Sequence, residues 1–129
     1  MATNPAVPYW DPADTITCIA KAAVVGKRFV VIDGTTNADG NPSVSSKAST
    51  ATNAVFGVSG YDAPKDAPVS VYCRGQVMPV TAAVALSAGD LVFSAADGKA
   101  TNVAVPDGRA AAIVIRDAAA NADTPVRLL

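Results

Sequence analysis

Short apolar segments alternate with turn signals along most of this chain, and no segment has the length or the periodicity of a long helix. From residue 55 onward, strand-like stretches of about five residues recur at spacings of roughly ten. The eleven acidic residues are all Asp, which favours turns, whereas Glu favours helix interiors. The pattern predicts an all-β chain, folded as a small barrel or a sandwich.

Individual segments support this prediction. The β-branched and aromatic stretch "KRFVVI" is bounded by Gly26 and by Asp33-Gly34, which predicts a strand. Asp97-Gly98 predicts a hairpin turn after "LVFSA". The polar stretch 35–53 lacks periodicity and is predicted to be a long loop, either a plain surface loop or a contact for a partner.

The first fourteen residues differ from the rest and are predicted to form an extended arm. They include three prolines, which lack a backbone donor and favour extended geometry, and the only Trp of the chain. Bulky side chains on an extended segment are good anchors, so the arm either folds back onto its own barrel or clasps a neighbouring subunit. The predicted contact residues are Pro5, Val7, Pro8, Tyr9 and Trp10.

Residues 15–129 are predicted to form one domain, within which the sequence partly repeats itself. Asp62-Ala63 matches Asp117-Ala118, and Pro68-Val69 matches Pro125-Val126 with two more residues in the second bend. The repeat divides the domain into two halves, residues 15–72 and 77–129. The similarity has two explanations, a duplication or the general resemblance of one β-hairpin to another.

Composition weighs against most kinds of site chemistry. The formal net charge is −1 with no basic block, so no nucleic-acid partner is predicted. The absence of His removes the commonest general base and metal ligand. Asp33, Asn37 and Asp39 resemble part of a calcium loop but lack its final Glu and flanking helices. We therefore predict no catalytic residue, no cofactor and no metal site, and a protein that is not an enzyme.

Two further features concern the core and the compartment. Cys18 and Cys73 lack metal-binding spacing and are either two buried thiols or one disulfide. There are 27 Ala residues, so the core is thin and contacts with neighbours are expected to add stability. No signal peptide or membrane-spanning segment is recognised, so we expect a soluble protein with no membrane partner, made in a cytoplasm.

Several stretches together resemble a known family. They are "NPAVPYWDPADTITCIAKAAVVGKRFVVI", "FGVSGYDA", "GQVMPVTAAVALSAGDLVFSAADGKAT" and the closing "TPVRLL". In this order they are similar to the small capsid decoration proteins of tailed bacteriophages, also called head cement or stabilisation proteins. Met78-Pro79-Val80 and Ala82-Ala83 stand where family members often have an apolar-Pro-Val and an Ala-Gly, which is a mild departure.

The resemblance implies a fold and a function. The fold would be a compact β-barrel or β-tulip domain. The protein would bind the major capsid protein on the outside of the mature head as a homotrimer and stabilise the shell, without a cofactor. It would be made in the host bacterial cytoplasm and become part of the virion exterior, with the arm as a capsid contact. The alternatives are a tail-tube or fibre-base subunit and, less favoured, a carbohydrate- or surface-binding module.

Overall fold

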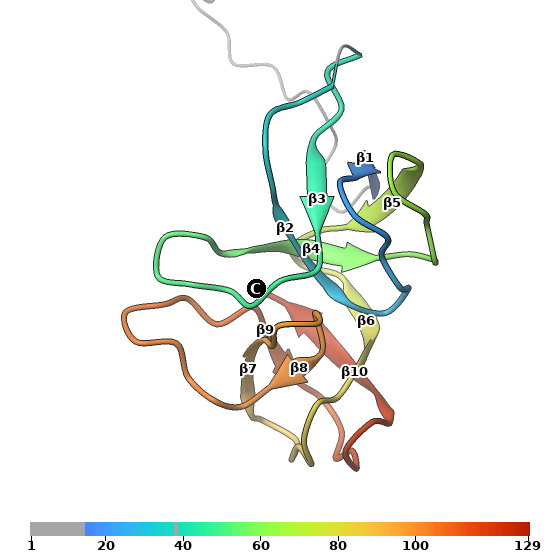
Figure 1. The fold of residues 1–129 in the computed structure, drawn as a ribbon. Coiled ribbons are helices and arrows are strands. Elements are labelled where there is room, and N and C mark those ends of the chain that lie inside the picture. Colours follow the sequence, from blue (N-terminus) through green and yellow to red (C-terminus); the bar gives the residue numbers. More distant parts are fainter. Residues whose placement is uncertain (1–14, 38) are drawn as a thin grey trace, which may run out of the picture.

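The computed structural model describes residues 15–37 and 39–129, and all regular elements among them are β-strands (Figure 1). This confirms the all-β prediction. The strands are β1 (Thr15–Ala20), β2 (Phe29–Ile32), β3 (Ser43–Ser45), β4 (Val55–Ser59), β5 (Pro68–Tyr72), β6 (Val77–Thr81), β7 (Leu91–Ser94), β8 (Ala100–Thr101), β9 (Ala112–Val114) and β10 (Asp123–Leu128).

The first five strands form a closed barrel in the order β1-β3-β2-β4-β5, as predicted for a small barrel. Its interior is filled by small and β-branched side chains, among them Cys18, Val30 and Val69, which are fully buried. Short side chains allow the strands to approach closely. At Gly57 in β4 an added Cβ would lie 2.6 Å from the side chain of Val71, so the barrel has no room for a larger residue there.

The prediction of an unbroken loop over residues 35–53 is wrong, because this stretch contains β3. The strand pairs in parallel with β1, where Ile19 is opposite Ser43, and antiparallel with β2. Val44 is its only apolar side chain and is fully buried. With two serines around a single valine, the segment has too little alternation to be recognised as a strand from sequence.

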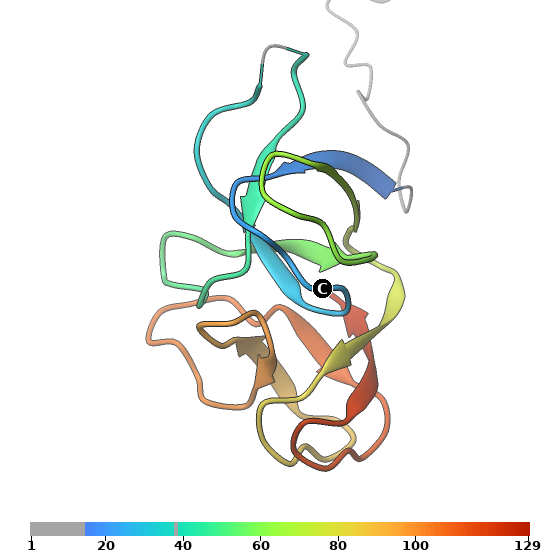
Figure 2. The same ribbon diagram turned by 45° about the vertical axis from the view of Figure 1, so that its right-hand side comes forward.

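The last five strands form a second sheet in the order β6-β10-β9-β7-β8. It lies beneath the first barrel in both ribbon views (Figures 1 and 2). An isolated parallel bridge between Ala82 and Ala100 joins the end of β6 to β8. It corresponds to the parallel pairing of β1 with β3, so the two sheets share one topology.

The register of the two halves agrees strand by strand. Ile19 pairs with Pro68 in the first half, and Thr81 pairs with Asp123 in the second. The same shifts, 62 residues for β1 and β2 and 55 residues for β4 and β5, reproduce every pairing of β6 with β10 and of β7 with β9. The backbone hydrogen bond from Gly60 to Ser70 (2.8 Å) likewise corresponds to the one from Ile115 to Pro125 (3.0 Å).

This correspondence changes the alignment that the sequence suggested. Asp62-Ala63 and Asp117-Ala118 are structurally equivalent, because each Asp accepts a 2.8 Å hydrogen bond from a backbone N–H, of Gly26 or of Ala88. The two Pro-Val pairs are not equivalent. Pro125 is the counterpart of Ser70, and no residues are inserted in the second bend.

The buried apolar residues form two clusters, one inside the first barrel and one that contains residues of both halves. Phe29 and Val58 belong to the first barrel, yet they pack with the buried residues of the second half. Backbone hydrogen bonds also cross between the halves, from Phe29 to Gly98 (2.8 Å) and from Thr81 to Lys27 (3.0 Å).

Candidate functional site

The predicted contact residues Pro5, Val7, Pro8, Tyr9 and Trp10 lie outside the described residues. Their role in contact with a capsid or a subunit stays a prediction. The structure does show a further candidate contact surface that the sequence reading did not single out.

This surface is the outer face of the second sheet, which we define by Val77, Leu91, Ile113, Ile115, Pro125 and Arg127. Arg127 of β10 pairs with Val77 on one side and with Ile113 on the other, and Ile113 pairs with Leu91. Residues paired in register point to the same side of a sheet, so these four form one row across four strands. Pro125 lies two residues from Arg127 on β10, and Ile115, directly after the end of β9, lies two residues from Ile113, so both are on the same face.

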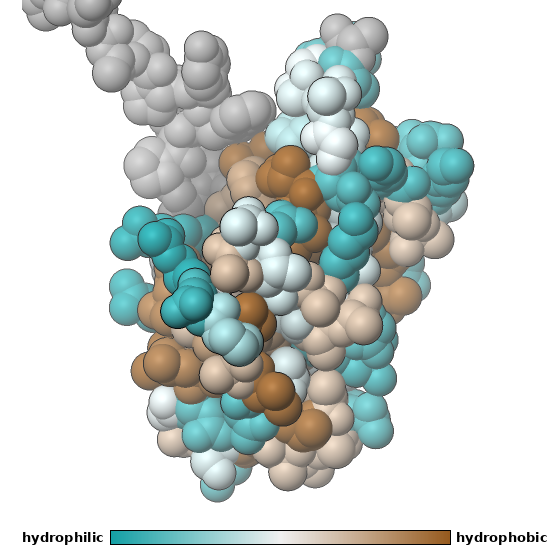
Figure 3. All heavy atoms as spheres, turned by 60° about the vertical axis from the view of Figure 1, so that its left-hand side comes forward, coloured by the Kyte–Doolittle hydropathy of each residue, from teal (hydrophilic) through white to brown (hydrophobic). Residues whose placement is uncertain are grey.

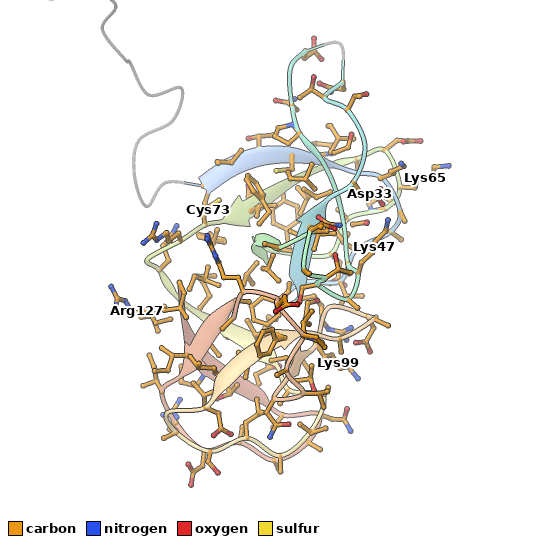
Figure 4. The ribbon with its side chains drawn as sticks, turned by 90° about the vertical axis from the view of Figure 1, so that its left-hand side faces the viewer. Asp33, Lys47, Lys65, Cys73, Lys99 and Arg127 are labelled. Atoms are coloured by element: carbon orange, nitrogen blue, oxygen red, sulfur yellow. The ribbon has the colours of Figure 1, made fainter. Side chains whose placement is uncertain are left out.

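The outer face is apolar and open to solvent in the described structure. Val77 is 55% exposed, Leu91 52% and Ile115 49%. In the space-filling view, brown apolar patches interrupt the teal surface over the lower half of the molecule (Figure 3). Arg127 projects away from the body of the protein (Figure 4) and forms no ion pair with any residue of the described part.

Two stretches of the sequence contain a signal for this face. Residues 77–80, "VMPV", and residues 112–115, "AIVI", are apolar at both even and odd positions. A strand with one solvated face alternates apolar and polar residues, whereas a strand covered on both faces is apolar throughout. These two stretches therefore indicate sheet positions that are covered on both sides.

The junction between the halves is held by an exposed ion pair. Lys27 Nζ donates a 2.8 Å hydrogen bond to Asp123 Oδ2, and Thr81 Oγ1 donates one of 2.8 Å to Asp123 Oδ1. The hydrogen bond from Lys27 and that from Thr81 lower the pKa of Asp123, and the bond to Asp123 raises the pKa of Lys27. This arrangement links the two halves across their junction.

Asp33 has the most perturbed carboxylate of the described residues. Lys47 lies 2.8 Å from one carboxylate oxygen, Ser45 donates a 2.7 Å hydrogen bond to the same oxygen, and Lys21 lies 3.3 Å from the other (Figure 4). The hydrogen bonds from Lys47 and Ser45 are the main reason that the pKa of Asp33 falls to about 2. The group ties β2 to β3 and to the chain that follows, which is a structural role.

The neighbouring residues of the calcium-like stretch are used by the loop itself. Asn37 Oδ1 accepts hydrogen bonds from the backbone of Asp39 (3.1 Å) and of Asn41 (2.8 Å). In residues 15–37 and 39–129, no cluster of three or more potential metal-ligating side chains is found.

Both cysteines are free thiols. Cys18 is fully buried, and burial is the main reason that its pKa rises to about 12. Burial also raises the pKa of Cys73. A thiol attacks as its thiolate, so neither group has the lowered pKa of a reactive cysteine. Of the two alternatives left open by the sequence, the structure has separate thiols.

Comparison with known proteins identifies the family. A profile of the phage cement proteins matches residues 9–129, which is nearly the whole chain. The chain belongs to the phage cement protein family. It is therefore a capsid-associated structural protein of a phage, as the resemblance implied. No curated protein sequence matches it.

A solved structure supports the fold independently. This phage cement protein is similar to a chain described as "head fiber gp8.5 N base in bacteriophage phi29", with a TM-score of 0.69 and 19% sequence identity. The match covers 89% of this chain and 92% of that one. At this low sequence identity, the structural match shows a shared fold alone.

Among the described residues there is no helix that could cross a membrane.

Proposed function

We propose that this phage cement protein binds the outer surface of the capsid, contacts the major capsid protein and stabilises the mature head as a homotrimer. The observation that supports this most is the family match over residues 9–129. A cement protein has to adhere to a shell rather than turn over a substrate. The protein would thus be made in the host cytoplasm, act on the virion exterior and have no enzymatic activity.

The N-terminal arm is the part that we propose makes the capsid or subunit contact. Its bulky residues include Val7, Tyr9 and Trp10, within a segment whose prolines favour extended backbone. Aromatic anchors provide much of the binding energy in protein interfaces. Because many copies bind one shell, a modest energy at each site can still stiffen the whole particle.

Cosedimentation with expanded, undecorated heads tests the binding. The full chain should bind saturably, and a chain that begins at residue 15 should bind at least tenfold more weakly. Trp10→Ala should weaken binding in the same direction, whereas the matched control Tyr61→Ala, at an exposed aromatic residue of the barrel, should not. Undiminished binding by the shortened chain would move the contact to the barrel, and no binding by the full chain would refute the function.

Stabilisation needs a separate measurement. Filled heads with and without the protein are heated, and the temperature at which DNA is released is recorded. The decorated heads should release DNA at a higher temperature. An unchanged release temperature at full occupancy would leave a bound protein without a cementing role.

A second candidate function is the base of a head fibre, which is how the similar phi29 chain is described. Cryo-electron microscopy of virions separates the two. Compact knobs would support a cement protein, and projecting fibres at the positions of this chain would support a fibre base.

A further inference from the structure

The outer face of the second sheet differs from the equivalent face of the first half at the positions of two large apolar side chains, which are buried in the first half. By the shared register, the row Val77–Arg127–Ile113–Leu91 corresponds to the row Thr15–Tyr72–Val58–Phe29. In the first half, the apolar end of the row, Phe29 and Val58, is fully buried against the second half. In the second half, the equivalent Leu91 is 52% exposed.

The comparison shows what kind of contact this row makes. In the first half, the large apolar side chains at these two cross-strand positions are covered by residues of the second half. At the equivalent positions of the second half, Leu91 is 52% exposed and Ile113 is only half-buried within the described residues. A contiguous exposed apolar patch of this kind marks an interaction surface.

Charge restricts the partner. The row of the second half has Arg127 where the first half has Tyr72. If two copies met through this face, Arg127 would meet a face that carries another Arg127 and, among its six defining residues, no carboxylate to pair with it. The partner should therefore offer apolar groups beside a carboxylate, from a different part of its surface.

The N-terminal arm has this chemistry. Val7, Tyr9 and Trp10 are followed directly by Asp11. An extended segment from Val7 to Asp11 spans about 13 Å at roughly 3.3 Å per residue. A row across four strands spans about 14 Å, with neighbouring strands about 4.8 Å apart. With Asp11 beside Arg127, the neighbouring Trp10 would lie over Ile113, and the rest of the segment would continue past Leu91. The arm thus offers apolar groups beside a carboxylate, as the row requires.

We propose that the outer face of the second sheet is the seat of the N-terminal arm of a second copy of this chain. Trp10 would pack over Leu91 and Ile113, with Asp11 beside Arg127. The contact is heterologous, since an arm meets a sheet, and such contacts form a closed ring when the rotation between copies closes. The inference rests on the proposed homotrimer and assigns its subunit contact.

Disulfide trapping tests this directly. Trp10→Cys and Leu91→Cys are combined in a chain with Cys73→Ser, where Cys18 remains buried. On oxidation, the chain should form linked dimers and trimers on a non-reducing gel, both in concentrated solution and on heads. The control pairs Trp10→Cys with Val103→Cys, a 67% exposed residue outside the sheet, and should remain monomeric.

The single Trp provides a second readout in the otherwise unmodified chain. Emission of Trp10 should shift to shorter wavelength as the protein concentration rises and the chains associate. Leu91→Lys, which places a charge on the apolar face, should abolish both the shift and the association. Val103→Lys should change neither.

Three results would overturn the proposal. A link that forms only within one chain would show that each arm covers its own sheet. Association that survives both Leu91→Lys and removal of residues 1–14 would place the subunit contact elsewhere. Association lost with Leu91→Lys but unaffected by removal of the arm would give the face another occupant. Each of these is compatible with binding of the full chain to heads, so it would leave the proposed capsid binding untouched.

Discussion

Replacement of Phe29 by Ala should destabilise both halves of the protein together. Phe29 extends from β2 of the first barrel, is fully buried and packs in the core of the second half. Truncation of a buried Phe to Ala costs about 3–5 kcal/mol, from lost transfer energy and the cavity left behind. In a domain of this size 1 kcal/mol corresponds to roughly 4 °C, so the unfolding midpoint should fall by about 12–20 °C.

Differential scanning calorimetry measures this loss and also tests whether residues 15–129 unfold as one domain. The wild-type chain and Phe29→Ala should each show one transition, with equal calorimetric and van 't Hoff enthalpies. Leu91→Ala is the matched control, because Leu91 occupies the equivalent position in the second half and is 52% exposed. In the dissociated chain it should cost no more than about 1 kcal/mol.

Two outcomes would refute the reasoning. Two separate transitions, of which Phe29→Ala moves only one, would mean that the halves unfold independently although one buried cluster contains residues of both. An equal loss for Phe29→Ala and Leu91→Ala, measured at a concentration where the chain is monomeric, would mean that burial at this position does not determine its contribution.

Three further predictions concern local structure. Gly57→Ala should lower the free energy of unfolding in urea by more than about 2 kcal/mol, because the new Cβ would overlap Val71; a loss below about 0.5 kcal/mol would contradict this. Asp66 has a φ of +68°, so Asp66→Ala should be about 1 kcal/mol less stable than Asp66→Gly, and equal stability in urea would rule out backbone strain there. The pKa of Asp33 is lowered from 3.8 to about 2, chiefly by the hydrogen bond from Lys47, so the unfolded chain takes up this proton at higher pH than the folded one. Stability present above about pH 4 should thus be lost as the pH falls toward 2, and Asp33→Asn should flatten the midpoint-against-pH curve there; an unchanged slope would argue against a role for Asp33.

Strands with strong local patterns could be predicted from the sequence. β2 is β-branched and aromatic, and a turn residue follows directly at Asp33. The turn at Asp97-Gly98 places Gly98 at a φ of +83°, a conformation that Gly adopts without strain. In both cases the residues that determine the structure are neighbours in the sequence, so a short window is sufficient.

Features that depend on distant contacts could not be predicted in the same way. β3 is a strand because Val44 fills the barrel and its backbone pairs with β1, more than twenty residues earlier. The sequence alignment of the two halves matched their identical Pro-Val pairs and was wrong there. Equivalent strand positions are determined by backbone hydrogen bonding and not by residue identity. Each half has one residue in the left-handed conformation between its first two strands. This residue is Lys27 (φ +61°) in the first half and its equivalent, Gly89 (φ +92°), in the second. No similarity of side chains would align these two residues.

Comparison of the two halves therefore distinguishes residues that the fold requires from residues that differ between the halves. Equivalent backbone hydrogen bonds recur at Ala20 and Ala82, and the shared small side chain fits a closely packed barrel. The differences include the row across the outer face of the second sheet, where Val77 and Arg127 are the equivalents of Thr15 and Tyr72. The common backbone pattern does not require these changes. Val77 is apolar where Thr15 is polar, and Arg127 adds a charge. A fold-determining position should thus affect stability when it is altered in either half, whereas Val77 and Arg127 should affect assembly at unchanged stability of the single chain.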